Sequence, residues 1–394
     1  MRAFCLAAII TVLPLAEVLP DDARGHLQAD LQTLKNVGHE GRGNPKATKC
    51  WQRVATASAD ALPEILTALD DANPLAANWI RLAVDAVASK EDSLPLESLT
   101  AFLAETKHNP RARRLAWELI HSRDSHLAEE LLDGMLDDPS LELRYDAVAQ
   151  MIDAVTQEKM GDAATATTSL KKALRAARNV EQIKSITASL KKLGESIDLQ
   201  EQFGFITDWQ IIGPFDNTDE TGFNTVFPPE QNIDLASRHS GKDGDVAWRQ
   251  FLSADPYGMM DLNKAFPGPG DGPKEVTAFA TTTFVAETSR PAELRLGCKN
   301  AWKVWHNGKL LFGRDEYHRG MRIDQYTMPV ALTAGDNTLL VKICQDGQTK
   351  DWTKQWQFQL RVCDATGGAI LSEKRPPTPS PEQAAATHGK EPPL

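Results

Sequence analysis

The spacing of apolar residues changes near residue 205, and this change limits the chain to two successive fold types. Before that point, apolar residues recur at the three- and four-residue spacing of amphipathic helices, for example over residues 79–87. After it, apolar and polar residues alternate, for example over residues 356–362, as in a strand with one buried face. We therefore expect a multidomain α + β chain, with helices over residues 46–200 and an antiparallel β-sandwich over residues 205–370.

Asn-Pro and Asp-Pro pairs separate the predicted helices, at residues 73–74, 109–110 and 138–139. Their spacings of 36 and 29 residues are typical of stacked helical hairpins. Residues 109–120 and 137–154 resemble HEAT repeats, and residues 161–194 resemble one tetratricopeptide (TPR) helix pair. The resemblance implies an α-solenoid-like domain whose groove binds a protein partner.

The charge of the chain restricts its partners. Lys and Arg number 43 against 54 Asp and Glu, which gives a net charge of −11 and excludes a general nucleic-acid binder. A locally basic stretch spans residues 159–192, with eight basic residues and two acidic ones. It is either a site for an acidic partner or a solvated helix face. We favour the solvated face, because no aromatic residues that could stack on bases are interleaved.

The sandwich region contains a strong hairpin signal. Asn307-Gly308 lies between two short apolar runs, and this pair favours a type I′ turn. In the preceding strand, Trp302 and His306 share one face, which we expect to face the core, while Trp305 lies on the other. By this parity we interpret His306 as a core histidine with its hydrogen bonds satisfied, rather than as a ligand.

Three segments carry a family resemblance: residues 209–230, 294–311 and 332–345. They resemble the galactose-binding-like jelly-roll domain, an accessory module of secreted bacterial enzymes, and the order of repeats followed by sandwich resembles uncharacterised exported bacterial proteins. The resemblance implies a jelly-roll fold and a carbohydrate ligand. The chain departs from the family at residues 298–300, which read Cys-Lys-Asn where an acidic or small residue is usual.

One loop combines charged groups with aromatic rings, as sugar recognition requires. It spans residues 313–320 and follows a predicted strand. The alternative is a solvated loop whose charges pair with one another at little energetic gain. The candidate ligand-binding residues are Arg314, Asp315, Tyr317, His318 and Arg319 from this loop, together with Trp352, which stands among charged residues in another predicted loop.

A second loop gathers oxygen ligands of the kind that Ca²⁺ prefers. Asp216, Asn217 and Asp219 are the candidate metal ligands for a structural calcium ion. The alternative is a polar turn after a strand, since the same residue types favour turns. Beyond this calcium ion we expect no cofactor.

The chain contains no Walker A loop, G-x-G-x-x-G, H-E-x-x-H, G-x-S-x-G or EF-hand motif. Asp315 and Glu316 are neighbours in sequence, so they tend to point apart instead of facing each other across a glycosidic bond. We therefore expect a binding protein without catalytic residues. The alternatives are a pure protein-interaction scaffold and a glycan-active enzyme.

The first residues predict export. Arg2 followed by an apolar run to Leu15 is typical of a secretory signal sequence, here residues 1–16, and implies a periplasmic or extracellular protein. The run is too short to span a membrane, and no other segment is suited to span one. Residues 17–45 are interpreted as a linker with room for one short helix, and the proline-rich residues 373–394 as a disordered tail.

Four cysteines follow the predicted leader, too few for a disulfide scaffold in a chain of this size. Cys344 and Cys363 stand at the ends of two predicted strands. If those strands formed a plain hairpin, the two ends would lie at opposite edges, beyond disulfide reach. We expect no bridge between them.

Overall fold

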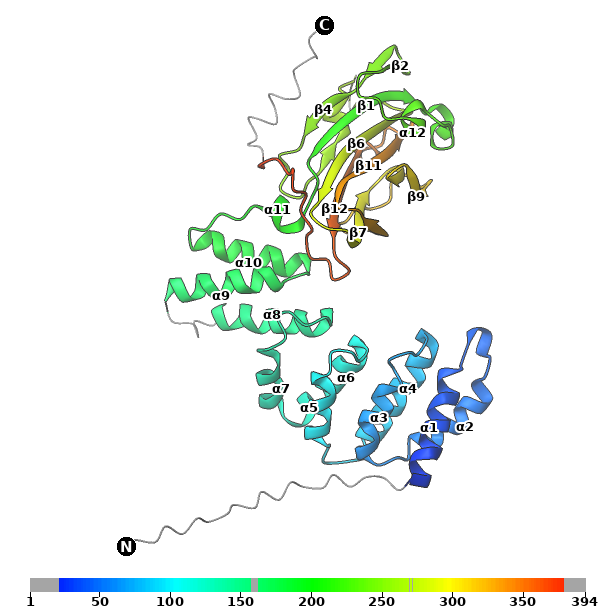
Figure 1. Cartoon of the computed structure of the whole chain (residues 1–394), viewed down its shortest axis with the longest axis vertical. Helices are drawn as coiled ribbons and strands as arrows, with labels where there is room; N and C mark the ends of the chain where they lie inside the picture. Colours follow the sequence, from blue (N-terminus) through cyan, green and yellow to red (C-terminus); the bar gives the residue numbers. More distant parts are fainter. Residues whose placement is uncertain (1–20, 157–161, 269, 271, 379–394) are drawn as a thin grey trace. The chain divides into compact units, whose positions relative to one another are not determined.

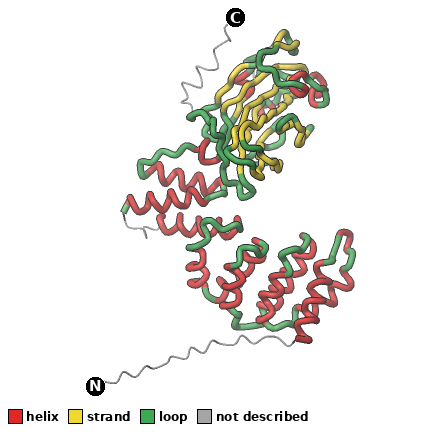
Figure 2. The backbone as a smooth tube through the Cα atoms, viewed as in Figure 1, coloured by secondary structure: helices red, strands yellow, loops and turns green. Residues whose placement is uncertain are grey.

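A computed structural model describes residues 21–156, 162–268, 270 and 272–378 of the chain. The expected signal sequence lies outside these residues, as does most of the expected tail. The chain divides into two compact units, Met1–Ala177 and Arg178–Leu394. Helices form the first unit and antiparallel sheets dominate the second, as the change in apolar spacing predicts (Figure 2). None of the described helices is both long and apolar enough to cross a membrane.

The first unit is a series of short helices, most of which pack on a helix that is next to them along the chain (Figure 1). Their bounds are α1 Asp21–Lys35, α2 Asn44–Val54, α3 Leu62–Thr67, α4 Pro74–Ala88, α5 Leu96–Ala104, α6 Pro110–Arg123, α7 Ser125–Leu132, α8 Leu141–Thr156 and α9 Ala163–Ala176, with 3₁₀ turns η1 His39–Gly41 and η2 Ala59–Ala61. Asn73 and Asn109 cap α4 and α6 by accepting hydrogen bonds from main-chain N–H groups, as Asn before Pro predicts.

Polar contacts between the turns of this unit recur at a nearly constant sequence separation. Asn73 Nδ2 donates to the carbonyl oxygen of Val37, 36 positions earlier, at 2.9 Å. His108 Nδ1 lies 2.8 Å from Asp70 Oδ2, 38 positions earlier. Side-chain hydrogen bonds therefore connect turns of this unit that lie 36 and 38 positions apart.

A buried ion pair joins two of these hairpins. The guanidinium of Arg113 donates two hydrogen bonds of 2.7 Å to the carboxylate of Asp138, and its Nε donates to the carbonyl oxygen of Leu103. Asp138 Oδ1 also accepts from the N–H of Ser140 at 2.8 Å. From the sequence, Asp138-Pro139 predicts only a helix boundary, whereas in the structure the Asp138 carboxylate holds Arg113 of α6 in place.

Two expected boundaries differ from the structure. The range 17–45 holds the fifteen-residue helix α1, which packs on α2 and α4, so it is not a linker. Its buried residues Leu27, Leu31 and Leu34 follow helical spacing, and this spacing is the sequence signal that predicts a helix here. The helical unit ends at Ala177, and the next helix belongs to the second unit.

The second unit begins with helices and continues as strands (Figure 1). Its helices are α10 Val180–Lys192, α11 Leu199–Phe203, α12 Pro228–Gln231 and α13 Leu262–Ala265, with 3₁₀ turns η3 Thr218–Phe223 and η4 Asp351–Thr353. Its strands are β1 Asp208–Asp216, β2 Arg238–Ser240, β3 Asp245–Ala247, β4 Arg249–Leu252, β5 Met260–Asp261, β6 Val276–Ala286, β7 Arg290–Cys298, β8 Ala301–His306, β9 Lys309–Arg314, β10 Tyr326–Leu332, β11 Gly335–Gln345 and β12 Gln357–Cys363.

Two antiparallel sheets share one hydrophobic core. The larger has the order β4-β1-β6-β11-β8-β9 and the smaller the order β10-β7-β12-β5, while β2 and β3 form a separate hairpin. The core lies between the sheets and includes Trp302, Trp356 and Phe358, each fully buried. The β8–β9 hairpin turns at Asn307-Gly308, both with positive φ, which confirms the predicted type I′ turn.

The outer face of the larger sheet is covered as well. A second apolar cluster there includes Phe215, Phe279, Trp305 and Leu340. Strand β11 is therefore buried on both faces, because residues of opposite parity along it enter the two clusters. An alternating pattern alone predicts one buried face and misses the second cluster.

Cys344 and Cys363 lie in different sheets, so the hairpin considered for them does not form. Strand β11 pairs with β6 and β8, whereas β12 pairs with β7 and β5. Both thiols are free and buried, as are those of Cys50 and Cys298. The plain hairpin assumed for Cys344 and Cys363 was therefore wrong.

A buried ammonium group holds the outer cover on the sheet. Lys342 of β11 is fully buried, and its Nζ donates to the carbonyl oxygens of Phe223 and Thr225 and to Glu230 Oε1, at 3.1, 2.7 and 2.8 Å. The rings of Phe227 and Phe279 lie 5.0 and 5.6 Å from the same nitrogen. Residues 223–230 cross the sheet above this ammonium group and supply its three hydrogen-bond acceptors.

We predict that Lys342→Met strongly destabilises the second unit. The substitution keeps the apolar volume but leaves the largely buried Glu230 carboxylate without its cation and the carbonyl oxygens of Phe223 and Thr225 without this donor, a change worth about 3–5 kcal/mol. Urea unfolding followed by tryptophan fluorescence measures the effect. Lys309→Met, at an exposed position of the neighbouring hairpin, is the matched control. Equal stability of the two variants would contradict the role assigned to Lys342.

A second charged network connects α11 to the smaller sheet. Arg361 of β12 donates to both oxygens of Asp324 and to the carbonyl oxygen of Phe203, and Arg295 of β7 donates to Asp324 from its other side. Burial alone raises the pKa of Asp324, but the hydrogen bonds and charges of Arg361 and Arg295 outweigh it and leave that pKa below its usual value.

We predict an acid-sensitive contribution to stability from Asp324. Because its folded-state pKa is lowered, its stabilisation is complete above the pKa of the unfolded chain and is lost as the pH falls through the folded-state pKa. Asp324→Asn should lower the free energy of unfolding by about 2–3 kcal/mol at neutral pH. The loss should shrink in acid, and a pH-independent loss in urea titrations would argue against this assignment.

Candidate functional site

Three loops meet at one end of the larger sheet. Strands β1 and β11 both run antiparallel to β6, and β9 runs antiparallel to β8, which is itself antiparallel to β11. Strands β1, β9 and β11 therefore point the same way, and the loops that follow them leave the same edge. We call residues 216–223, 313–320 and 346–353 the three-loop cluster.

Asn217 connects two of these loops. It is fully buried, and its Nδ2 donates to the hydroxyl oxygen of Tyr317 at 3.1 Å and to the carbonyl oxygen of Gln345 at 2.9 Å. Its Oδ1 is buried and has no hydrogen-bond partner among the described residues. A predicted metal ligand and a predicted sugar ligand thus come together, although 100 positions separate them.

His318 connects the second loop to the third. Its Nε2 lies 2.7 Å from Asp346 Oδ2, and both side chains are almost fully buried. The indole of Trp352 meets the His318 ring edge to face at 5.4 Å. The Trp352 side chain is nevertheless exposed, with 57% of its surface accessible. The Trp352 ring is therefore exposed to solvent and rests against the buried His318–Asp346 pair.

The base of the Trp352 loop is fixed by hydrogen bonds. Thr353 is buried, and its N–H and hydroxyl both donate to the carbonyl oxygen of Lys350 at 2.8 Å. Gln345 Nε2 donates to the carbonyl oxygen of Thr353 at 3.2 Å. The turn η4 consequently holds the indole in place without covering it.

Two carboxyl groups of the cluster, those of Glu220 and Asp315, have raised pKa values. Partial burial, followed by the negative charges of Asp346 and Asp315, raises the pKa of Glu220. Partial burial also raises the pKa of Asp315, although Lys303 opposes it. Burial raises the pKa of Tyr317 as well, so its hydroxyl stays protonated. The cluster is a compact group of carboxyls around one histidine and one exposed indole.

The two predicted arginines lie at the rim. Arg314 and Arg319 are exposed, and both pair with Glu316, at 3.6 and 3.3 Å. Such exposed pairs contribute little to stability, so the guanidinium groups can exchange partners. The structure brings Asp315, Tyr317, His318 and Trp352 together around buried polar groups and leaves the arginines beside them.

The three predicted metal ligands have separate surroundings. Asp216 Oδ1 accepts from the Thr218 hydroxyl at 2.7 Å and pairs with Lys242 at 3.2 Å, and these contacts lower the pKa of Asp216. Asn217 is buried as described, and Asp219 is exposed. Within the described ranges no group of three or more His, Cys, Asp or Glu side chains is placed to hold a metal ion. Calcium at this loop stays a prediction.

The parity argument for strand β8 is confirmed. Trp302 packs in the core between the sheets, and Trp305 packs in the outer cluster. His306 is buried, and its Nε2 lies 3.1 Å from Asn337 Oδ1, as expected for a core histidine with its hydrogen bonds satisfied.

Sequence reasoning missed Glu220 and Asp346. Asp346 follows directly on β11 and precedes a glycine, which is a usable signal for a polar turn at a strand end. Glu220 directly follows Asp219, one of the predicted calcium ligands. Neither residue could be assigned to His318 from the sequence, because the contact depends on which strands end at the same edge.

Comparisons with known proteins give no family. No family matches the chain, and no curated protein matches it. A Kluyveromyces marxianus β-glucosidase solved with glucose is 15% identical with a TM-score of 0.19, over 23% of this chain and 10% of that one. A PA14 sugar-binding domain from an RTX adhesin is 12% identical with a TM-score of 0.23, over 40% and 89%. An anti-sigma factor domain-containing protein from Clostridium clariflavum is 12% identical with a TM-score of 0.23, over 43% and 49%. These likenesses carry no argument about function.

We predict that Gly222→Ala disrupts the packing of the three-loop cluster around Asn217. A Cβ at this buried glycine would lie 2.5 Å from Asn217 Oδ1 and 2.7 Å from Thr277 Oγ1, so Asn217 must shift away from Tyr317. Overpacking of this kind costs about 1–3 kcal/mol. Thermal unfolding, with Gly320→Ala as the control because nothing lies within 4 Å of its Cβ position, measures the effect. An unchanged melting temperature for Gly222→Ala would count against the packing described.

Proposed function

We propose that the protein is a non-catalytic binding protein whose three-loop cluster takes a carbohydrate or another cell-envelope glycan. The observation that carries the proposal is the exposed indole of Trp352, held on the buried His318–Asp346 pair. A flat apolar ring bordered by hydrogen-bonding groups suits a sugar, which has an apolar face and a rim of hydroxyls.

The surroundings of Trp352 fit this ligand class. The carboxyls of Asp315 and Glu220 accept hydrogen bonds from hydroxyls, and Arg314 and Arg319 at the rim donate to ring and hydroxyl oxygens. The ion pairs of the two arginines with Glu316 are weak, so a ligand that replaces them loses little binding energy. The buried connections through Asn217 and Thr353 order the loops before binding, which lowers the entropy lost when a ligand binds.

We propose that the sheet unit is a galactose-binding-like jelly roll and that the helical unit is a stub of HEAT- or TPR-like repeats. The shared core of two antiparallel sheets supports the first, and the contacts at separations of 36 and 38 positions support the second. A repeat surface of this kind takes a protein partner. With the leader predicted from the sequence, the protein acts outside the cytoplasm, in the periplasm or beyond it.

The sugar proposal is tested on a glycan array with the labelled full chain, with and without calcium, beside Trp352→Ala. We expect saturable binding that the variant lowers at least about tenfold, as is usual for a tryptophan at the centre of a binding surface. The variant should remain as stable as the parent, because its indole is largely exposed. A requirement for calcium would support the predicted cation at Asp216, Asn217 and Asp219.

Leu310→Ala is the matched control, since Leu310 is also exposed, at 47%, but lies outside the three-loop cluster. It should leave binding unchanged. No binding across the array by a well-folded chain would reject the carbohydrate ligand and favour a pure protein scaffold. Release of shortened glycans during incubation would favour a glycan-active enzyme instead.

A further inference from the structure

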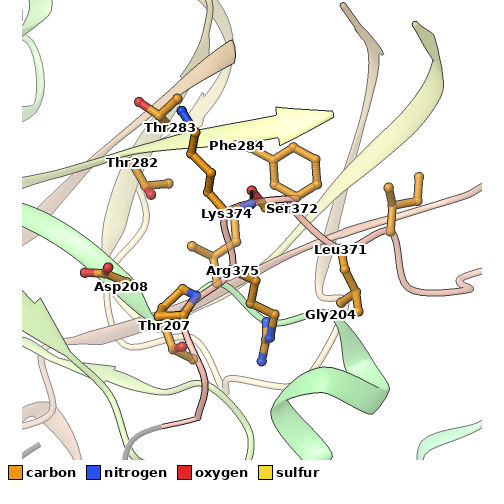
Figure 3. A pocket seen from close by; sticks show the side chains of 13 residues that line it. Gly204, Thr207, Asp208, Thr282, Thr283, Phe284, Leu371, Ser372, Lys374 and Arg375 are labelled. Carbon is orange, nitrogen blue, oxygen red and sulfur yellow. Dashed lines mark hydrogen bonds between the residues drawn. The ribbon is translucent and has the colours of Figure 1, made fainter. Parts of the chain in front are cut away.

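A cavity lies where the larger sheet meets the C-terminal segment, and it is lined by elements other than the three-loop cluster. Its volume is about 100 Å³, and its walls come from the start of β1, from β6 and from residues 370–376. Figure 3 shows the side chains around it. This segment is ordered by its contacts, although part of it falls in the range expected to be a disordered tail.

The cavity exists because one neighbour of β6 ends before the next begins. The ladder between β1 and β6 starts at the pair Gln210–Thr281. Further along β6, the C-terminal segment takes the place of β1: Val285 donates its N–H to Ser372 Oγ at 2.9 Å and accepts from the N–H of Glu373 at 2.9 Å. Between the start of the β1 ladder and the C-terminal segment, β6 has no paired strand on this side among the described residues. We call this gap the sheet notch.

The main chain of Thr283 faces this notch. In an antiparallel strand, alternate residues turn both main-chain polar groups to the same neighbour. Val285 turns its N–H and C=O toward the C-terminal segment, so Thr283, two residues earlier, turns its own to the same side. No strand residue of the described chain pairs with Thr283 there. The notch therefore offers one main-chain donor and one main-chain acceptor, which are costly to leave unsatisfied.

Asp208 supplies a second acceptor. Its carboxyl is half-buried, and Oδ1 accepts from Gln250 Nε2 at 2.8 Å. Burial raises the pKa of Asp208, and no cation of the described residues pairs with it. A partly desolvated carboxyl without a cation favours a ligand that donates hydrogen bonds to it.

Lys374 supplies a mobile donor. Figure 3 shows its side chain extending across the cavity toward Thr283. Among the described residues its ion pair is an exposed contact of 3.8 Å to Asp336, which does little to hold the side chain in place. The ring of Phe284 and the side chain of Leu371 complete the lining with apolar surface.

Donors and acceptors thus line the same cavity beside an apolar wall. A hydroxyl group satisfies both kinds of partner, because it donates one hydrogen bond and accepts others. The carboxyl of Asp208 stands against the cations of Lys374 and Arg375 in the same lining, so the cavity carries charges of both signs. A cavity of roughly 150 Å³ holds one benzene molecule, so about 100 Å³ suits a three-carbon polyol or one edge of a sugar ring.

We propose that this sheet notch is a separate binding site for a neutral polyhydroxy compound. The ligand is a free polyol of glycerol size or the terminal unit of a glycan, held by Asp208, by the main chain of Thr283 and by Lys374. The site does not depend on sugar binding at the three-loop cluster.

Saturation-transfer NMR on the full chain tests the site, with glycerol as one probe and a methyl glucoside as the other. We expect saturable binding of at least one probe, in the millimolar range that so few atoms allow. Preference for glycerol indicates a free polyol, and preference for the glucoside indicates a glycan end. Asp208→Asn should weaken binding several-fold, because a neutral amide is a poorer acceptor than the carboxyl.

Lys374→Met is the second variant, and its exposed position carries no risk to folding. It should weaken binding about two- to fivefold, consistent with the loss of one hydrogen bond. Leu310→Ala, at an exposed position outside the notch lining, should leave this binding unchanged. Two results would overturn the proposal. One is saturation that survives both Asp208→Asn and Lys374→Met, and the other is a lack of saturation with both glycerol and the methyl glucoside.

Discussion

A single buried charge organises the sheet unit. Lys342 lies in the centre of β11, a strand with apolar clusters on both faces, and no water reaches its ammonium group. An isolated ammonium is not stable in such a place. The residues that follow β1 must cross the outer face and bring Glu230 and two carbonyl oxygens onto it. The position of the chain from Phe223 to Glu230 is therefore a consequence of this one requirement.

The three-loop cluster inherits its order from that constraint. The residues immediately before the cover form η3, and fixing Phe223 also fixes the preceding loop with Asn217 and Glu220. Asn217 then reaches Tyr317, which precedes the His318 that supports Trp352. Charge compensation under the sheet thus leads, by a chain of hydrogen bonds, to an exposed indole at its edge. The exposed ion pairs of Arg314 and Arg319 with Glu316 lie at the rim of the site.

Short-range features of this fold could be predicted from the sequence. The Asn307-Gly308 turn, the parity of Trp302 and Trp305, and the exposure of Trp352 follow from local spacing and composition. Strand pairing could not be predicted, because β11 and β12 follow each other in sequence but belong to different sheets. A lysine within an alternating strand is ordinarily read as solvent-facing. Its burial depends on a glutamate 112 positions away.

The site shows the same division. The residue types suited to sugar contact were recognised in the 313–320 loop, but their partners were not. Asp346 and Glu220 acquire their roles only when β1, β9 and β11 end at one edge, which is a property of register and strand order. The sheet notch was also invisible, since it reflects where one strand stops and the C-terminal segment begins to pair.

Hydrogen–deuterium exchange of the full chain, with and without soluble cell-wall glycan fragments, tests most directly whether the three-loop cluster is the ligand-binding surface. The account predicts slower amide exchange in residues 216–223, 313–320 and 346–353 when the fragments are added. Exchange that is unchanged in all three segments, or slowed only within the helical unit, would contradict it.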